Sequence, residues 1–154
     1  MAIEIKRPPL DFETNVALGL DLPMNSTNGS GFEMNFLSID QAVANVKNLM
    51  LTNHGERPMH PKFGLNLRGI LFDNATDQLE ATIRDEVDDN FSFWLPYIFI
   101  NELVVDRPDD YPNKLIIQIT ISLVGNEIDT RSVQIALNTD DGSATGATVN
   151  SNTY

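Results

Sequence analysis

Acidic side chains are the groups most able to do chemistry in this sequence, which has 22 Asp and Glu residues against 10 Lys and Arg residues. A glycosidase needs two carboxyl groups about 5 to 9.5 Å apart in a cleft, one of them with a raised pKa. The densest acidic stretch instead lies on a predicted helix, where solvated charge is the ordinary outcome: Glu80, Asp85, Glu86, Asp88 and Asp89. The single tryptophan, Trp94, offers little surface for stacking a sugar. We therefore expect no catalytic residue and no enzymatic activity.

Potential metal ligands are sparse. The sequence has no cysteine, which excludes both a disulfide scaffold and a thiolate zinc site. His54 and His60 are not spaced as an i, i+4 helical metal pair, and they do not fit a catalytic triad. We expect both histidines at the surface, and we expect no metal and no cofactor.

The segment Glu56 to Gly64 combines charged and conformationally special residues. Glu56 and Arg57 come directly after Gly55, and Pro58 and Pro61 interrupt the rest of the segment. The two charges could form a local ion pair, or the carboxylate could lie near amides of the turn. Because an exposed ion pair contributes only about 0 to 1 kcal/mol, stability alone is a weak reason for these charges. A role in binding a partner or organising the loop is therefore favoured over purely solvated charge.

Two long helices and a short one are predicted to position this loop. Ser38 and Gln41 form the pattern of a capping box, and the helix that they begin is predicted to end at Gly55. Its apolar stripe is Ile39, Val43, Val46, Leu49 and Met50. A short helix comes next, with Leu67, Ile70, Leu71 and Phe72. A second long helix is predicted from about residue 76 to Pro96, with a stripe of Leu79, Ile83, Val87 and Phe91.

From Tyr97 onward the apolar period changes to two, which is typical of strands. The clearest alternation is Leu115, Ile117, Ile119, Ile121 and Leu123, and Val133, Ile135 and Leu137 repeat it after a turn around Gly125. Asn101 and Glu102 interrupt the first strand, from residue 98 to 105, which indicates a bulge or a contact on both faces. The expected fold class is α+β, with two long helices and a short helix packed on a three-stranded antiparallel meander.

The two ends of the chain differ from its middle. Residues 1–37 contain prolines, a polar tract and scattered apolar residues, which suggests an extended N-terminal arm lying on its own core or on a neighbour. Residues 138–154 are rich in Thr, Asn, Ser, Gly and Ala, so we expect a flexible tail. The single domain is predicted to span residues 38–137.

The charge of the chain limits its partners. The formal net charge is -12, so the electrostatic attraction that dominates non-specific nucleic-acid binding would be repulsive here. The sequence has no stretch of 18 apolar residues, and its first ten residues lack the apolar run of a signal peptide. We expect no nucleic-acid partner, no membrane partner and synthesis in a cytoplasm-like space.

An ordered series of short motifs resembles the baseplate wedge and sheath-initiator family of contractile-tailed phages. The series, which lies within residues 38–137, is Ser38-Ile39-Asp40-Gln41-Ala42-Val43, Val46-Lys47-Asn48-Leu49-Met50-Leu51-Thr52, Gly55-Glu56-Arg57-Pro58, Pro61-Lys62-Phe63-Gly64 and Leu71-Phe72-Asp73. Related proteins include a baseplate component of type VI secretion systems, and some relatives have carried a lysozyme label.

This resemblance implies a structural role in a virion tail baseplate that assembles in the host cytoplasm. Implied partners are the other wedge proteins, the tail sheath protein and central hub or tube-proximal proteins. The residues implied to bind partners or organise the loop are Glu56, Arg57, Pro58, Phe63, Gly64, Leu95, Pro96 and Tyr97. Family members commonly carry Glu-Pro-Arg where this chain has Leu95-Pro96-Tyr97, so a contact made by those two charges would be absent or rebuilt here.

The resemblance also implies that the sheet templates the first ring of sheath subunits. A free edge strand offers unpaired N–H and C=O groups to which another chain can add a strand. Since the last predicted strand precedes a polar tail, we expect it to be that edge, through Ser132, Val133, Gln134, Ile135, Ala136 and Leu137. The alternatives are a regulatory protein-binding adaptor with the same fold and a peptidoglycan hydrolase.

Overall fold

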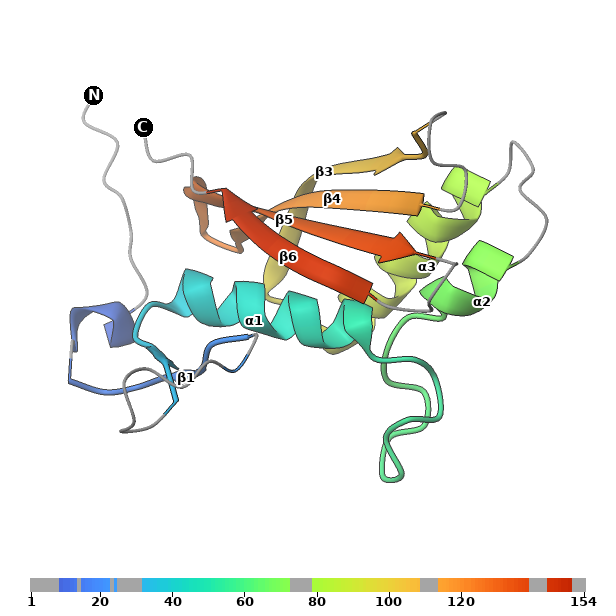
Figure 1. Cartoon of the computed structure of the whole chain (residues 1–154). Helices are drawn as coiled ribbons and strands as arrows, with labels where there is room; N and C mark the ends of the chain where they lie inside the picture. Colours follow the sequence, from blue (N-terminus) through green and yellow to red (C-terminus); the bar gives the residue numbers. More distant parts are fainter. Residues whose placement is uncertain are drawn as a thin grey trace.

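The computed structural model describes residues 9–13, 15–22, 24, 32–72, 79–108, 114–138 and 144–150. A four-stranded antiparallel sheet packs against helices, so the predicted α+β class is confirmed (Figure 1). The strands of this sheet are β3 (Ile98–Asp106), β4 (Lys114–Leu123), β5 (Asn126–Asn138) and β6 (Ala144–Asn150). The helices are α1 (Ser38–Leu51), α2 (Leu67–Phe72) and α3 (Leu79–Trp94). A 3-10 turn, η1 (Pro9–Phe12), and the short strands β1 (Gly19–Leu20) and β2 (Met34–Asn35) precede them.

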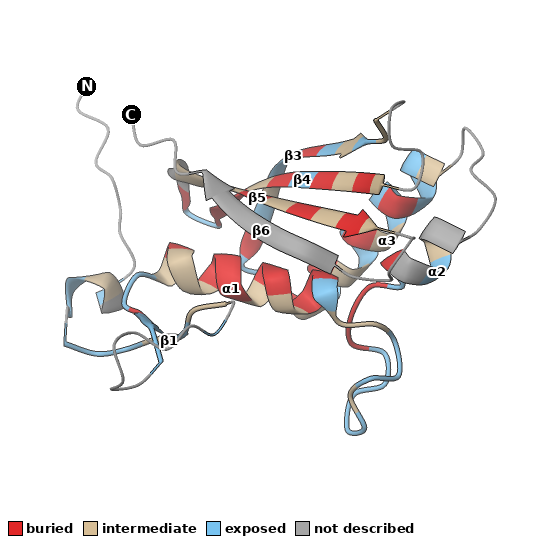
Figure 2. Ribbon diagram, in the orientation of Figure 1, coloured by how far each residue is buried: buried red, intermediate tan, exposed pale blue. Residues whose placement is uncertain are grey.

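Helix α1 lies across one face of the sheet, against β4 and β5 (Figure 1). Its predicted apolar stripe is confirmed, and every member is at most 3% exposed: Ile39, Val43, Val46, Leu49 and Met50. Ala42, Ala44 and Lys47 are buried as well, so α1 is covered on more than its stripe (Figure 2). A helix this enclosed is stabilised mainly by packing rather than by intrinsic propensity.

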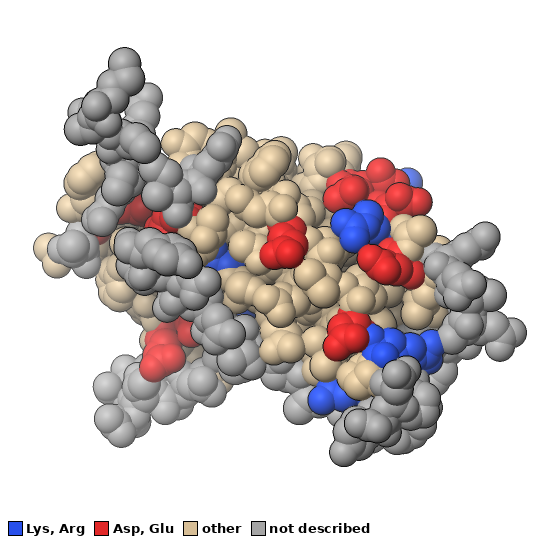
Figure 3. All heavy atoms as spheres, turned by 90° about the horizontal axis from the view of Figure 1, so that it is seen from above, with Lys and Arg blue, Asp and Glu red and all other residues tan. Residues whose placement is uncertain are grey.

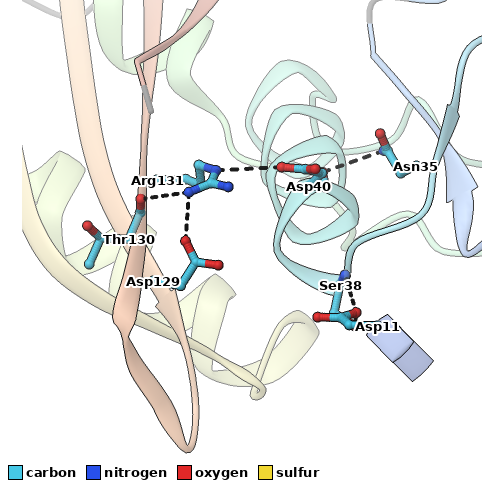
Figure 4. A network of polar contacts seen from close by, with 7 residues as sticks. All are labelled: Asp11, Asn35, Ser38, Asp40, Asp129, Thr130 and Arg131. Carbon is cyan, nitrogen blue, oxygen red and sulfur yellow. Dashed lines mark hydrogen bonds and ion pairs between the residues drawn. The ribbon is translucent and has the colours of Figure 1, made fainter. Parts of the chain in front are cut away.

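The predicted capping box at the start of α1 is wrong. Leu37 occupies the N-cap position and makes no side-chain cap bond. The Ser38 backbone N–H and its hydroxyl both donate to Asp11 Oδ1, at 2.8 and 2.7 Å, as Figure 4 shows for this pair. The carboxylate of Asp11 thus satisfies a free N–H of the first turn and places negative charge at the positive end of the helix dipole.

The end of α1 also differs from the prediction. The helix ends at Leu51, and Thr52 continues the chain in an extended conformation. Gly55 does adopt a left-handed conformation, with φ of 87°, but it lies in a turn beyond the helix. Gly55 is therefore a positive-φ position, as predicted, but it belongs to a separate turn and not to the C-terminus of α1.

The short helix α2 and the end of α3 agree with the sequence. Helix α3 ends at Trp94, just before Pro96, and its start near residue 76 lies outside the described residues. Ile83 and Val87 are completely buried and Phe91 is 2% exposed, so the predicted stripe faces the core. Within the described part of the chain, no helix is long and apolar enough to cross a bilayer.

The sheet buries one face and leaves the other partly open. Along β4 the buried positions alternate as predicted, with Leu115, Ile117, Ile119 and Ile121 fully buried (Figure 2). The expected irregularity in β3 is a bulge, because the register with β4 shifts between Ile100 and Glu102. The extra residue, Asn101, accepts a hydrogen bond of 2.8 Å from the buried Ser122 hydroxyl.

The three-stranded meander is a correction, because a fourth strand comes after β5. β6 pairs antiparallel with β5 from Leu137↔Ala144 to Ser132↔Asn150, and it lies outermost in the sheet. Of the residues predicted as a flexible tail, 144–150 form this strand, and residues 139–143 and 151–154 lie outside the described residues. Although this segment has little apolar surface, pairing with β5 provides main-chain hydrogen bonds that composition does not reveal.

The N-terminal arm is not simply extended. β1 and β2 pair antiparallel through Gly19↔Asn35 and Leu20↔Met34, and this two-stranded ribbon packs on α1. Of the two surfaces expected to receive the arm, the chain's own core is thus in contact with it. The parts of residues 1–37 before Pro9 and between Asn25 and Gly31 lie outside the described residues.

Candidate functional site

Five predicted site residues, Glu56 to Gly64 in sequence, lie in the loop that connects α1 to α2. Two backbone hydrogen bonds close the loop, from Gly55 N to Pro61 O at 2.8 Å and from Leu65 N to Thr52 O at 3.0 Å. Two tight turns within it are fixed by His60 N to Arg57 O and Phe63 N to His60 O. The loop projects away from the sheet and helices in Figure 1, and these bonds make it a stiff protrusion.

Gly64 closes the base of this loop. It has a φ of 106°, a left-handed conformation that side chains with a Cβ rarely adopt. A Cβ on Gly64 would also overlap the carbonyl oxygen of Thr52, the acceptor of the closing bond from Leu65. Two separate features therefore require glycine at this position: the positive φ and the close approach of two backbone segments.

Glu56 organises the turn after α1. Its Oε2 accepts a hydrogen bond of 2.9 Å from the Asn53 backbone N–H, and its Oε1 accepts one of 2.7 Å from Asn53 Nδ2. Of the alternatives that the sequence left open, a carboxylate near amides of the turn is the one that these contacts match. The acidic side chain is thus part of the loop's own structure.

Arg57 and Phe63 attach the loop to the ends of α1 and α3. The guanidinium carbon of Arg57 lies 3.8 Å from the centre of the Phe63 ring, and its Nη2 donates to Asn48 Oδ1 at 3.0 Å. The Phe63 ring in turn meets the edge of Trp94, with ring centres 5.2 Å apart. A cation–π contact such as that between Arg57 and Phe63 contributes about 2 kcal/mol when it is desolvated and about 0.5 to 1 kcal/mol at an exposed site.

The tip of the loop is exposed and partly apolar. Pro58 and His60 are exposed, and Met59 is 86% exposed. His60 also lies edge-on to Trp94 at 5.9 Å, and His54 is exposed at 3.8 Å from a Glu86 oxygen. The prediction that both histidines are surface residues is confirmed.

The turn from α3 into β3 consists of Leu95, Pro96 and Tyr97, and its side chains differ in exposure and contacts. Leu95 is buried, whereas Tyr97 is 41% exposed. The Tyr97 hydroxyl accepts a hydrogen bond of 2.7 Å from Asn45 Nδ2 on α1. Tyr97 therefore connects this turn to α1, while the neighbouring Trp94 contacts the loop.

A row of polar side chains on α1, which was not predicted from the sequence, joins these pieces. Gln41 Nε2 donates to Asn45 Oδ1 at 3.0 Å. Asn45 Nδ2 in turn donates to the Tyr97 hydroxyl, and Asn48 Oδ1 accepts a hydrogen bond from Arg57. Thr52 continues the row by donating to the Asn48 carbonyl at 2.6 Å. The sequence contains a matching pattern, because the polar residues at positions 41, 45, 48 and 52 have helical spacing.

A shallow hollow of about 260 Å³ lies beside Tyr97. Its described lining comes from the arm, α1 and the end of the β3–β4 pair where β3 begins and β4 ends, namely Leu18, Ser38, Gln41, Ala42, Asn45, Tyr97 and Leu123. None of these lining residues is an Asp or Glu, so the hollow offers no carboxyl pair for acid–base chemistry. Its apolar and amide lining suits an uncharged side chain.

The acidic side chains that could have been catalytic lie elsewhere. Glu80, Asp85, Asp88 and Asp89 on α3 are exposed and Glu86 is half-buried, which agrees with a solvated helix face. In the face drawn in Figure 3, red Asp and Glu side chains gather in separate places, with blue Lys and Arg between some of them. Among the described residues, no group of three His, Asp or Glu side chains is placed to hold a metal ion.

The predicted strand-addition edge is wrong in its position. Ser132, Val133, Gln134, Ile135, Ala136 and Leu137 pair with β4 on one side and with β6 on the other. Both sides of this stretch of β5 are therefore occupied. Of the strands that the structure describes, β3 and β6 form the two edges of the sheet.

A stiff exposed loop, a sheet with β3 and β6 as its outer strands and a hollow whose described lining has no carboxylate define a small α+β protein suited to contacts with other chains. Residues 38–127 match the protein-family model described as baseplate wedge protein gp25. This match covers more than half of the chain, and the chain belongs to that family. The family assignment implied by the sequence motifs is thereby confirmed.

Two known proteins similar to this chain belong to baseplates. Baseplate wedge protein gp25 of Enterobacteria phage T4 is 29% identical over 99 residues, which cover 60% of this chain and 72% of the relative. A chain in the cryo-EM structure of the anti-feeding prophage baseplate superposes with a TM-score of 0.59 at 21% identity, covering 68% of this chain and 82% of that one.

A crystal structure of a putative tail lysozyme from Geobacter sulfurreducens is also similar. It superposes with a TM-score of 0.55 at 20% identity, covering 66% of this chain and 91% of that one. At such low identities, these two structural similarities establish the fold alone.

Proposed function

We propose that this protein is a structural component of the baseplate wedge of a contractile phage tail, and that its sheet templates the first ring of tail sheath subunits. Membership of the baseplate wedge family supports the structural role and the tail location. The sheet order supports the templating role, because β3 and β6 are its outer strands and a sheath strand could add to one of them by main-chain hydrogen bonds. Other wedge proteins, the sheath protein and hub or tube-proximal proteins are the proposed partners.

The outer edge of β6 is the better candidate for strand addition. β3 carries three features that protect an edge: a bulge at Asn101, the charges of Glu102 and Asp106, and a hydrogen bond of 3.3 Å from Arg84 Nη2 to the Leu103 carbonyl. The residues of β6, 144–150, include no charged residue and no proline. We therefore propose β6 in place of the β5 residues that the sequence favoured.

Proline substitutions in β6 test this role. Successive N–H groups of an edge strand point alternately toward the sheet and away from it, so of Thr148→Pro and Val149→Pro only one removes a bond to β5. The variant that keeps wild-type stability should enter baseplates and fail to nucleate sheath. Sheath on assembled baseplates would be counted by electron microscopy.

A matched pair on the other edge controls for a general effect of proline. Of Val104→Pro and Val105→Pro in β3, the variant that folds should enter baseplates and nucleate sheath normally. Normal sheath on the folded β6 variant would rule out the β6 edge. Loss of sheath only with the β3 variant would assign the template to β3 instead.

The loop from Glu56 to Gly64 and the turn at Leu95 to Tyr97 are proposed to meet the neighbouring wedge proteins. The loop is stiff, projects from the body and ends in the exposed Met59. Where family members commonly have two charges beside the proline, this chain bonds Tyr97 to Asn45 within itself. The Tyr97 hydroxyl is therefore engaged within the chain, and we propose that the ring of this residue, which is 41% exposed, meets the neighbour instead.

A cell-wall hydrolase is the alternative suggested by the similarity to a putative tail lysozyme. We propose that this chain is not an enzyme, since its hollow is lined without Asp or Glu among the described residues and its α3 acids lie on an open face. Purified protein should release no more peptidoglycan fragments than a buffer control. Glu56→Gln should loosen the turn at Asn53 without changing that background. Cleavage abolished by one carboxylate substitution would overturn the structural assignment.

A further inference from the structure

The N-terminal arm has an inner side that is fixed to α1 by polar contacts. Asn35, which is 8% exposed, pairs with Gly19 across the β1–β2 ribbon. Its Nδ2 lies 3.2 Å from Gln41 Oε1 and 3.3 Å from the Leu20 carbonyl oxygen. A Cβ on Gly19 would meet the Gln41 side chain, so the ribbon lies directly on the helix.

Two further contacts, one at the first residue of α1 and one at Lys47, hold the arm against the helix. The Asp11 carboxylate caps Ser38, and the buried Lys47 ammonium donates to the Leu22 carbonyl oxygen. The helix is in turn tied to β5, because Arg131 Nε lies 3.5 Å from Asp40 Oδ1 (Figure 4). The arm is therefore held as part of the folded body, with a fixed side turned away from it.

That outward side is apolar. Leu20 and Met34 are directly opposite each other across the ribbon, on the side away from Asn35, and they are 41% and 53% exposed. Phe32 and Phe36 flank Met34 at two-residue steps, which places them on the same side of an extended chain, and they are 57% and 42% exposed. We call Leu20, Phe32, Met34 and Phe36 the outer face of the arm. Clustered exposed apolar side chains of this kind mark an interaction site.

The arm carries charges of one sign along the part that the structure describes. The sequence has no Lys or Arg from Pro8 to Val46, whereas Glu13, Asp21 and Glu33 lie within the arm. A second copy of the chain would bring these carboxylates against their equivalents, and each copy carries a net charge of -12. An anionic membrane would be repelled for the same reason. A partner carrying positive charge fits.

We propose that the outer face of the arm is a docking surface for an amphipathic segment of another protein, in which apolar residues are flanked by Lys or Arg. The apolar side chains would bury Phe32 and Met34, and the basic ones at the flanks would be attracted by the negative charge of the arm. The surface lies outside residues 38–127, the part that matches the family model, and on a different strand pair from the proposed sheath template. It does not depend on the proposed function.

Selection from a random peptide library tests the proposal directly. The full chain would be used to select peptides of about 12 residues, enough for one short amphipathic segment. We expect the enriched peptides to share apolar residues flanked by Lys or Arg. Their affinity should fall at least about tenfold for the Phe32→Ser/Met34→Ser double variant, which removes two apolar anchors. Raising the salt concentration should also weaken binding.

A control variant replaces equally exposed apolar residues elsewhere. Met59→Ser/Val104→Ser changes side chains that are 86% and 42% exposed, in the loop and in β3, and it should bind the peptides as the wild type does. Because all four side chains are exposed, both variants should keep the wild-type melting temperature. Failure to enrich any peptide, enrichment of acidic peptides or equal binding by the Phe32→Ser/Met34→Ser variant would overturn the proposal. A dimer in sedimentation that this variant abolishes would show that a second copy is the occupant, which also overturns it.

Discussion

Replacing Ile83 by alanine is expected to lower the free energy of unfolding by about 2 to 5 kcal/mol. Ile83 lies in the middle of α3, is completely buried, and belongs to the single core cluster that joins α3 to α1 and the sheet. Because the buried members of this cluster come from α1, α3 and the sheet, little freedom remains to close the cavity, and the cost of such a substitution rises with the residual cavity volume.

The matched control is Leu51→Ala, at the last residue of α1. Leu51 is 42% exposed, so its truncation removes little buried surface, and the change should stay within about 0.5 kcal/mol. Both variants would be compared by urea unfolding monitored by circular dichroism. A loss below about half a kcal/mol for Ile83→Ala would mean that α3 does not pack through this face.

The parts of the fold that the sequence predicted are those with a regular apolar period. The stripes of α1 and α3 and the alternation of β4 are confirmed because each element buries one continuous face, which leaves a period of about 3.6 or of 2 in the sequence. The bulge at Asn101 was also visible, since a polar pair interrupted an apolar alternation. Such signals depend on neighbouring residues only.

The errors come from contacts between residues far apart in the chain. Ser38 has the local pattern of a capping box, but Asp11 binds it from another segment, 27 residues away, and displaces the local arrangement. The residues of β6 were predicted to lie in a flexible tail because they are small and polar, yet β5 supplies them with hydrogen-bonding partners. Local propensity reflects neither partner, and for that reason the predicted sheet edge lies one strand too early.

The candidate site shows the same division. The local role of Glu56 at the turn was among the alternatives open from the sequence, because its partner Asn53 is only three residues away. The bond between Asn45 and Tyr97 spans 52 residues, and nothing in either local sequence indicates it. The row of polar residues on α1 could have been noticed, but its partners could not have been named.

Gly64→Ala and Gly55→Ala form a pair that separates two costs of replacing a glycine in the loop. Both residues have positive φ, 106° and 87°, so each alanine must adopt a left-handed conformation at a cost of about 1 to 2 kcal/mol. At Gly55 nothing lies within 4 Å of the added Cβ, whereas at Gly64 it meets the backbone of Thr52. A carbonyl group cannot move aside as the end of a flexible side chain can.

Gly64→Ala should therefore destabilise the protein by about 1 to 3 kcal/mol more than Gly55→Ala, the range typical of overpacking. The added methyl group must push Thr52 away from Leu65, which weakens the hydrogen bond that closes the base of the loop. Urea unfolding would give the difference in stability, and hydrogen exchange at the Leu65 amide should accelerate only in Gly64→Ala. Equal losses of stability and equal exchange rates at Leu65 in the two variants would mean that the backbone segments around Thr52 and Leu65 can separate freely. The loop would then be too flexible to present Met59 and Pro58 in one orientation to a neighbouring wedge protein.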